Sequence, residues 1–217
     1  MSKVCVRGFS VSLDGYGAGP RQSEQDPVGV GGRRLHRWMW GTRTMRQRFG
    51  LEGGGTGLDD EVAKRHDVGF GATIMGRNMF GPVRGPWEDE SWRGWWGETP
   101  PWGYPVFVLT HHARPSLEMD GGTTFHFVTG GVDEALARAR EAAGDKDVLI
   151  SGGAATIRQL LDRQLIDELD LAVVPILLGE GERLWDGLSP DAAAGYRMAE
   201  LRCSDAVAHV RMERVEG

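Results

Sequence analysis

Apolar residues run together or alternate with polar ones in several short segments, and each such segment predicts a β-strand. The first covers residues 3–13 and ends at Asp14-Gly15, a pair typical of a turn. The tail predicts an antiparallel hairpin around Ser204-Asp205. In the last internal strand, Pro175 predicts a bend or an end. The predicted internal strands are 72–75, 105–110, 124–128, 147–151 and 169–178, and those of the hairpin are 196–203 and 206–215.

Between these strands, apolar residues return every three or four positions, which predicts amphipathic helices. The helices are predicted at 59–68, 132–143 and 154–165, with a shorter one at 35–40. Strands that alternate with helices in this order predict an α/β domain with a mainly parallel sheet and an antiparallel end. No repeat or linker interrupts the pattern, so we expect residues 1–217 to form a single domain.

Two irregular regions interrupt the regular pattern. Residues 15–57 contain twelve glycines, and residues 78–104 are rich in tryptophan. The tryptophans of the second region are Trp87, Trp92, Trp95, Trp96 and Trp102. Two interpretations are open. These aromatic side chains either hold the loop against the protein or form a dimer contact, or else the loop is a lid over a planar substrate.

Charge and cysteine content exclude several classes of protein. Lys and Arg number 25 against 31 Asp and Glu, a net charge of −6, which argues against nucleic acid or an anionic membrane as the main partner. Cys5 and Cys203 are the only cysteines, so neither a zinc finger nor a disulfide framework is predicted, and we expect no metal site. No signal peptide or apolar span is recognisable, and we expect a soluble cytoplasmic protein.

The most informative local feature is a glycine pair between a buried strand and a helix. Gly152-Gly153 follow the strand, and the helix opens at Ala154-Ala155-Thr156. Glycine lets a ligand approach the backbone closely, and the free amides of a helix start favour an anion such as a diphosphate. The same two residues also suit simple tight packing of the helix on the sheet, and both interpretations stay open.

Two further strand ends carry cationic or hydroxyl side chains. Gly76-Arg77-Asn78 follows one strand, and Thr110-His111 with Arg114 follows the next. A guanidinium such as that of Arg77 can pair with a phosphate through two hydrogen bonds, although it can equally lie in solvent. Because open α/β sheets bind ligands at the carboxyl ends of their strands, three such junctions together predict a site for a phosphorylated ligand.

In their order along the chain, five segments resemble the dihydrofolate reductase-like superfamily. Within it they are most similar to the reductase domain at the carboxyl end of the riboflavin-biosynthesis deaminase/reductase RibD and to its stand-alone bacterial relatives. The resemblance implies a three-layer α/β/α sandwich, an NADPH-dependent reductase and a homodimer. The matching segments are FSVSLDGYGAG (9–19), GATIMGRNMF (71–80), PVFVLTHHARP (105–115), DVLISGGAATIRQLL (147–161) and LIDELDLAVVPILLGEGERLW (165–185).

The resemblance also implies roles for individual residues. Asp14 is expected beside the nicotinamide, where either Asp14 or water supplies the proton, unless Asp14 only caps its turn. The peptide between Gly152 and Gly153 is expected to be cis. Substrate contacts are expected from Ser12, Arg34 and Trp38. Coenzyme contacts are expected from Gly76, Arg77, Asn78, Thr110, His111, Arg114, Gly152, Gly153, Ala154, Ala155 and Thr156.

Departures from the family pattern reduce the number of candidate activities. Dihydrofolate reductases carry a carboxylate on the helix after the first loop, whereas residues 32–38 here contain arginines and no acid. Arginines there suit a phosphorylated substrate, although they can equally form a solvated helix face. The chain lacks the HxE and PCxxC motifs of a zinc deaminase. We therefore expect a 5-amino-6-(5-phosphoribosylamino)uracil reductase that delivers hydride to the ribosyl C1. The alternatives are a dihydrofolate or other pterin reductase and a non-catalytic nucleotide-binding protein.

Overall fold

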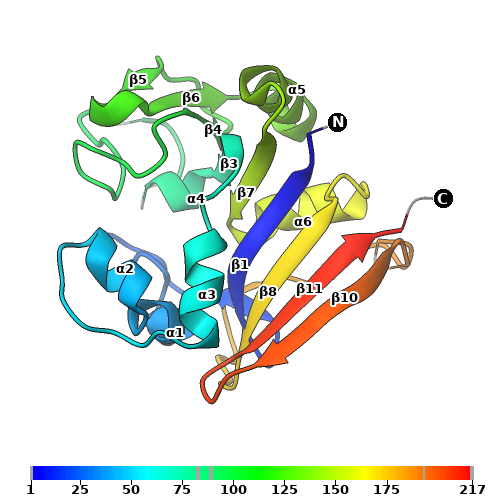
Figure 1. Cartoon of the computed structure of the whole chain (residues 1–217). Helices are drawn as coiled ribbons and strands as arrows, with labels where there is room; N and C mark the ends of the chain where they lie inside the picture. Colours follow the sequence, from blue (N-terminus) through cyan, green and yellow to red (C-terminus); the bar gives the residue numbers. More distant parts are fainter. Residues whose placement is uncertain (1, 82–83, 88–89, 193, 216–217) are drawn as a thin grey trace.

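The computed structural model describes residues 2–81, 84–87, 90–192 and 194–215. In this part of the chain, nine strands form one sheet in the order β10-β11-β8-β1-β7-β3-β4-β6-β5 (Figure 1). The parallel strands are β1 (Val4–Ser12), β3 (Phe70–Gly76), β4 (Pro105–Leu109), β6 (Thr124–Val128), β7 (Asp147–Gly152) and β8 (Glu168–Val174). The antiparallel strands are β5 (Leu117–Glu118), β10 (Tyr196–Cys203) and β11 (Ala208–Arg214). The predicted α/β class, with its mainly parallel sheet and antiparallel carboxyl-terminal hairpin, is confirmed.

Helices cover both faces of the sheet (Figure 1). On one face, α5 (Gly131–Ala143) and α6 (Ala154–Asp162) pack on the central strands. The other face is covered by η1 (Gly32–His36), α1 (Arg37–Trp40), α3 (Leu58–Arg65) and α4 (Arg77–Phe80), with α2 (Arg43–Arg48) beside α3. A short separate ribbon pairs β2 (Tyr16–Ala18) with β9 (Glu182–Arg183), and η2 (Asp120–Gly122) precedes β6. These layers match the expected α/β/α sandwich.

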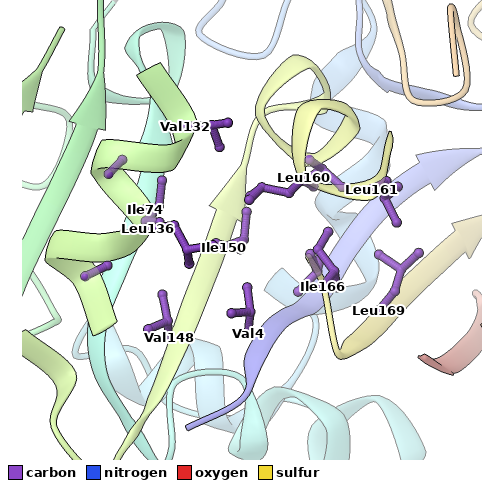
Figure 2. Packing of buried hydrophobic residues seen from close by; sticks show 14 of the residues in the cluster. Val4, Ile74, Val132, Leu136, Val148, Ile150, Leu160, Leu161, Ile166 and Leu169 are labelled. Atoms are coloured by element: carbon purple, nitrogen blue, oxygen red, sulfur yellow. The ribbon is translucent and has the colours of Figure 1, made fainter. Parts of the chain in front are cut away.

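The main core lies between the sheet and the α5–α6 layer, as Figure 2 shows. Because neighbouring strand residues point to opposite faces, Val4 of β1 faces this core while Cys5 packs with Phe70 on the other side. From the helices, Leu136 and Leu160 complete the core with fully buried or nearly buried side chains. At about 25 cal/mol per Å² of apolar area, this burial is the main force that holds the layers together.

Some sequence-based boundaries differ from the structure. The helix expected at 154–165 ends at Asp162, because Gln164 has a φ of 53°, in the left-handed region that ends a helix. The ladder of the strand expected at 169–178 ends at Val174, which confirms the bend or end predicted at Pro175, a residue with no amide to continue it. The short helix expected at 35–40 is a 3₁₀ turn followed by one turn of α-helix.

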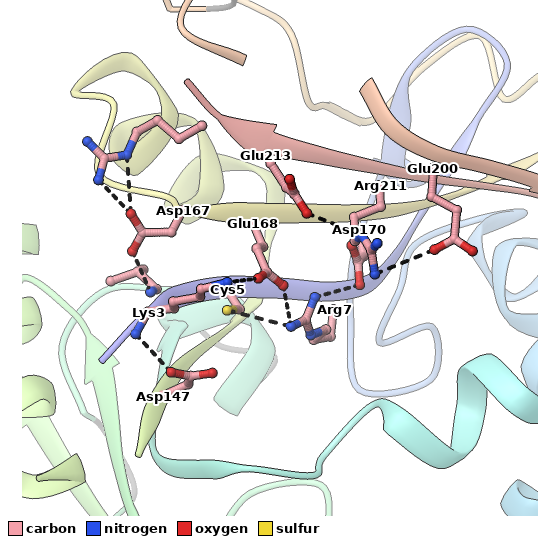
Figure 3. Close-up of polar contacts among 12 residues, drawn as sticks. Lys3, Cys5, Arg7, Asp147, Asp167, Glu168, Asp170, Glu200, Arg211 and Glu213 are labelled. Carbon is pink, nitrogen blue, oxygen red and sulfur yellow. Dashed lines mark hydrogen bonds and ion pairs between the residues drawn. The ribbon is translucent and has the colours of Figure 1, made fainter. Parts of the chain in front are cut away.

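A network of charged side chains covers β1, β8, β11 and β10 on the sheet face opposite the α5–α6 layer (Figure 3). Arg7 is its centre, with Nη2 2.5 Å from Glu168 and Nη1 2.8 Å from Asp170. A surface hollow of about 290 Å³ lies between this network and α3. It lies beside the middle of β1, at Gly8, and none of the predicted site residues lines it. The predicted coenzyme residues lie instead at the ends of β3, β4 and β7.

Candidate functional site

The ends of β3 and β7 bring two of the predicted junctions together. Met75 of β3 is the register partner of Gly152 in β7. The next residue, Gly76, lies so close to α6 that a Cβ atom built there would be 2.6 Å from Oγ1 of Thr156. Only glycine permits this approach. The two glycine-containing turns therefore form one continuous backbone surface, as the sequence predicts.

The Gly152-Gly153 peptide is cis, which confirms the hypothesis made from the family resemblance. Gly153 is the N-cap of α6, and no side chain caps this helix start. A Cβ atom built on Gly153 meets nothing within 4 Å, so the space in front of the turn is open. The first amides of a helix lack intrahelical acceptors, and with Ala154 and Ala155 leading the helix they can bind an anion here.

Arg77, which follows Gly76, supplies a guanidinium that is held in an unusual way. Its Cζ atom lies 2.9 Å from the centre of the Trp87 ring, and Nε and Nη1 are buried with no hydrogen-bond partner among the described residues. Burial, and after it the nearby Arg114, lower the pKa of Arg77 to about 10. A buried guanidinium without an acceptor is destabilised, and an anion that reached it would relieve that cost.

Trp87 connects the second and third junctions. Its indole Nε1 donates to the carbonyl of His112 at 2.9 Å, and Arg114 lies 4.8 Å from the same ring. Arg114 also donates to the carbonyl of Glu90 and lies 5.1 Å from the Phe127 ring. The structure thus gathers Arg77 and Arg114 around one indole, and the two cations face the same region.

The remaining predicted coenzyme residues, Asn78, Thr110 and His111, follow the ends of β3 and β4. Thr110 is buried at the end of β4, and its hydroxyl accepts from the amide of His112 at 3.2 Å. His111 is exposed. Asn78 donates through Nδ2 to Oε1 of Gln22 at 3.3 Å, which links α4 to the glycine-rich region.

Asp14 does not suit the predicted role of proton donor. Its carboxylate accepts hydrogen bonds from the Ser12 hydroxyl at 2.5 Å and from the amides of Leu178 and Gly179. Burial alone would raise the pKa of Asp14, but these hydrogen bonds outweigh it and lower the pKa below its usual value. An acid that must give up a proton near neutral pH needs the opposite shift. We correct the expectation accordingly: Asp14 anchors the turn to the loop after β8.

The three predicted substrate residues lie in different environments. Ser12 is buried, and its hydroxyl is fully engaged with Asp14 and the amide of Tyr16. Trp38 is also buried, and its Nε1 donates to the hydroxyl of Ser10 at 3.0 Å, which gives this side chain a place in the core instead of a free face for a ligand. Arg34 lies on η1 with its side chain exposed. Of the three, Arg34 alone presents a free polar group.

Sequence reasoning missed several residues of this region. Trp87, Gln22, Arg84 and Glu182 all contact or adjoin the predicted residues. They belong to irregular segments that carry neither strand nor helix periodicity. The only available signal was composition, because the tryptophan-rich segment follows directly on Gly76-Arg77-Asn78.

Across residues 2–81, 84–87, 90–192 and 194–215, His, Cys, Asp and Glu side chains form no group of three or more that could hold a metal ion. Over the same ranges, no helix has the length and apolar character needed to cross a membrane.

Comparison with solved structures shows the same fold. The chain matches a protein assigned to riboflavin biosynthesis from Shewanella sp. PV-4 with a TM-score of 0.58 and 20% identity, covering 100% of both chains. A pyrimidine reductase-like protein from Corynebacterium diphtheriae gives a TM-score of 0.55 at 13% identity, covering 100% of this chain and 93% of that one. At these identities the likeness establishes the architecture and leaves activity open.

A bifunctional protein is also similar. The diaminohydroxyphosphoribosylaminopyrimidine deaminase/5-amino-6-(5-phosphoribosylamino)uracil reductase of Thermotoga maritima matches with a TM-score of 0.56 and 15% identity, and the match covers 98% of this chain but 56% of that one. No curated protein sequence matches the chain. The sequence profile of the RibD C-terminal domain matches residues 4–210, which is almost the whole chain. The protein therefore belongs to the RibD C-terminal domain family.

Proposed function

We propose that this protein is an NADPH-dependent reductase similar to 5-amino-6-(5-phosphoribosylamino)uracil reductase, with residues 1–217 forming one reductase domain. Family membership supports a riboflavin-pathway oxidoreductase. The observation that carries the proposal lies at the ends of β3 and β7, where an uncapped helix start adjoins Gly76 and the next residue, Arg77, has Nε and Nη1 without an acceptor among the described residues. A diphosphate supplies the acceptors that both groups lack.

The residues present fit a dinucleotide. The amides at the start of α6 and the turn at Gly152-Gly153 would hold the paired phosphates, since backbone N–H groups at a helix N-terminus favour negative charge. Arg77, with Arg114 close by, would bind a phosphate group through charge-assisted hydrogen bonds. Asn78, Thr110 and His111 remain proposed coenzyme contacts.

The chemistry divides between coenzyme and protein. When bound, NADPH supplies the hydride, which this proposal directs to the ribosyl C1 of the substrate. The protein's contribution is alignment, because holding two reactants in line removes much of the entropic barrier. With Asp14 held as a carboxylate, we assign proton delivery to water. Arg34 remains our candidate for the substrate phosphate.

Three candidate activities can be separated in one assay. Purified protein is mixed with NADPH and either the ribosylaminouracil phosphate or dihydrofolate, and the loss of reduced-nicotinamide absorbance is followed. Turnover of the uracil compound supports the proposal. Turnover of dihydrofolate alone would instead make the protein a folate reductase. Coenzyme binding without turnover of either compound would make it a non-catalytic nucleotide-binding protein.

Arg77→Ala tests the coenzyme site directly. We expect NADPH binding, measured by isothermal titration calorimetry, to weaken by about 1–3 kcal/mol, because a charge-assisted hydrogen bond is lost. Arg93→Ala is a matched control from the same tryptophan-rich segment, where Arg93 pairs with Glu98. Unchanged affinity in Arg77→Ala would remove this contact from the proposal.

We also propose that the protein acts in the cytoplasm as a homodimer. The homodimer is carried over from the family resemblance and from the aromatic content of residues 84–104, in which Trp95 and Trp102 are only partly buried. Light scattering at high protein concentration should give twice the mass of one chain. A mass of one chain would contradict the dimer without affecting the reductase proposal.

A further inference from the structure

A second hollow, of about 460 Å³, lies beside the predicted coenzyme site, and its lining suggests a specific ligand group. It is bounded by residues 19–22, Arg84 and residues 180–182. Gln22 connects it to the coenzyme site, because its Oε1 accepts both from Asn78 and from Nη2 of Arg84, each at 3.3 Å. The hollow is formed by the glycine-rich region, the tryptophan-rich segment and the loop that leads into β9.

The charges around this hollow balance. Arg84 lies 3.0 Å from Glu182, and Arg21 lies 3.9 Å from Glu180. Two carboxylates repel a phosphate, and two guanidinium groups repel a cation, so the lining favours an uncharged polar group. This distinguishes the hollow from the neighbouring region around Arg77, where Arg114 is a second cation close by.

The walls are polar backbone instead of aromatic surface. Among the described residues that line the hollow, none is aromatic and only Pro20 has an apolar side chain. A Cβ atom on Gly181 would collide with the carbonyl of Ala18, so glycine backbone forms part of the wall. Flat heterocycles bind mainly between apolar and aromatic side chains, and these are missing here. A pteridine or nicotinamide ring is therefore a poor fit.

The available hydrogen-bonding atoms suit neighbouring hydroxyl groups. Oε1 of Glu182 takes the contact with Arg84, which leaves Oε2 to accept from a ligand, and the Glu182 side chain is 33% exposed. Arg84 donates through Nη2, and its other N–H groups remain as donors. A carboxylate beside a guanidinium offers an acceptor and a donor a few ångströms apart, which matches the two hydroxyls of a vicinal diol.

Backbone strain also marks this hollow. Arg21 has a φ of 54°, a conformation that residues other than glycine adopt uncommonly. Strained conformations of this kind concentrate at ligand-binding segments, where the surrounding structure holds them in place.

We propose that this hollow binds the vicinal hydroxyls of a ribosyl group, with Glu182 and Arg84 as the residues that recognise them. The inference rests on the proposed function for the origin of that ribosyl group, since the coenzyme and the substrate would each bring one. The shared chemistry is a ribose diol, and the experiment separates its two sources.

Glu182→Gln and Arg84→Met test the recognition, with Arg93→Met as the control outside the hollow. Binding of NADPH and of 2′,5′-ADP, which lacks the nicotinamide riboside, is measured by calorimetry, and KM is measured for the ribosylaminouracil phosphate. Loss of a hydrogen bond to a charged group should weaken the ribose-bearing ligand about tenfold. If the variants bind NADPH more weakly but bind 2′,5′-ADP as the wild type does, the hollow belongs to the coenzyme. If only the KM for the ribosylaminouracil phosphate rises, the hollow belongs to the substrate. Either result supports the proposal.

Two results would overturn it. In the first, both variants stay within about twofold of the wild type for every ligand. In the second, 2′,5′-ADP weakens as much as NADPH, which would indicate a general disturbance of the loops.

A direct probe keeps this inference separate from the proposed function. Methyl β-D-ribofuranoside is titrated into the ¹⁵N-labelled protein, and the amide signals of Gly19 and Gly181 are followed. We expect a saturable shift in the wild type that disappears in Glu182→Gln and with the 2-deoxy riboside, which lacks the vicinal diol. If the wild type binds no dinucleotide, the reductase proposal fails and this titration alone decides the inference. No response to the riboside would then overturn it.

Discussion

Asp14 shows how one side chain can match a family position and still lack the expected chemistry. Three donors surround its carboxylate and hold it ionised. Two of them are backbone amides of residues 178 and 179, more than 160 positions away in the chain. The carboxylate therefore joins the turn after β1 to the loop after β8, and both loops border the proposed site.

Asp14→Asn should separate stability from catalysis. We expect the free energy of unfolding, measured by urea denaturation, to fall by about 1–2 kcal/mol, because charge-assisted hydrogen bonds become weaker neutral ones. The pH dependence of kcat should keep its shape, since water supplies the proton. A variant of normal stability whose kcat falls by orders of magnitude would return Asp14 to the role of acid.

We expect the buried carboxylate of Asp60 to make a contribution to stability that depends on pH. The carboxylate is buried, accepts from the Thr44 amide at 2.7 Å and lies 2.9 Å from Nζ of Lys64. Burial alone would raise the pKa of Asp60, but the hydrogen bonds from Thr44 and Lys64 lower it from 3.8 to about 2. Because the folded-state pKa is the lower one, the contribution is complete above pH 3.8 and is lost as the pH falls through about 2.

Asp60→Asn should therefore be less stable than the wild type at neutral pH, by about 1–3 kcal/mol. Urea unfolding at decreasing pH should show this difference shrinking only below about pH 4, where the wild-type carboxylate begins to protonate. Asp145→Asn, at an exposed turn residue, is the control and should match the wild type throughout. A difference that stays constant down to pH 2 would contradict the role of the charge.

At the scale of elements, the turn between β7 and α6 predicts different outcomes for two glycines. Gly76→Ala places a Cβ atom 2.6 Å from Oγ1 of the buried Thr156, so we expect a destabilised protein. Gly153→Ala places one in open space, with φ at −74°, so the fold should tolerate it. If a diphosphate packs on this turn, Gly153→Ala should nevertheless weaken NADPH binding about tenfold or more. Thermal unfolding and calorimetry measure the two effects, and a Gly153→Ala protein with normal affinity would place the diphosphate elsewhere.

The regular elements could be predicted from sequence because their information is local. Alternation in β1 separates Val4 from Cys5, and the helical repeat of α5 identifies Leu136 as a core residue. The irregular contacts could not be predicted. Arg84 reaches Gln22 and Glu182, which lie 62 and 98 positions away, and no periodic pattern relates such residues. Arg77 was identifiable only because it directly follows a strand.

At the scale of the whole molecule, Arg7 connects the first strand to the carboxyl-terminal half of the sheet. Its side chain is 20% exposed, and it bonds Glu168 and Asp170 of β8; Asp170 in turn is the register partner of Arg211 of β11 (Figure 3). Burial raises the pKa of Asp170 despite Arg7. Burial also acts to raise the pKa of Glu168, but Lys3 and Arg7 outweigh it and lower that pKa.

Arg7→Met should destabilise the protein by up to about 3 kcal/mol, because it leaves two partly buried carboxylates with less compensation. Protonation of both carboxylates relieves that cost, so the deficit should diminish at acidic pH, first for Asp170, whose pKa is raised, and then for Glu168, whose pKa is lowered. Arg163→Met removes an exposed pair with Asp133 and should leave the stability close to that of the wild type. Thermal unfolding of the three proteins at two pH values checks both expectations. Equal effects of the two substitutions would show that the network adds nothing beyond ordinary surface pairs.

The tryptophan-rich segment has one practical consequence. Trp92 and Trp95 lie 4.6 Å apart with their planes at 78°, and Trp96 and Trp102 lie 4.5 Å apart at the same angle. Indoles held this closely in a fixed chiral arrangement couple their electronic transitions and give a strong near-ultraviolet circular dichroism signal. The segment is thus its own label. Titrating a coenzyme or substrate while recording this signal would reveal, without any attached dye, whether the tryptophan-rich segment changes conformation when a ligand binds.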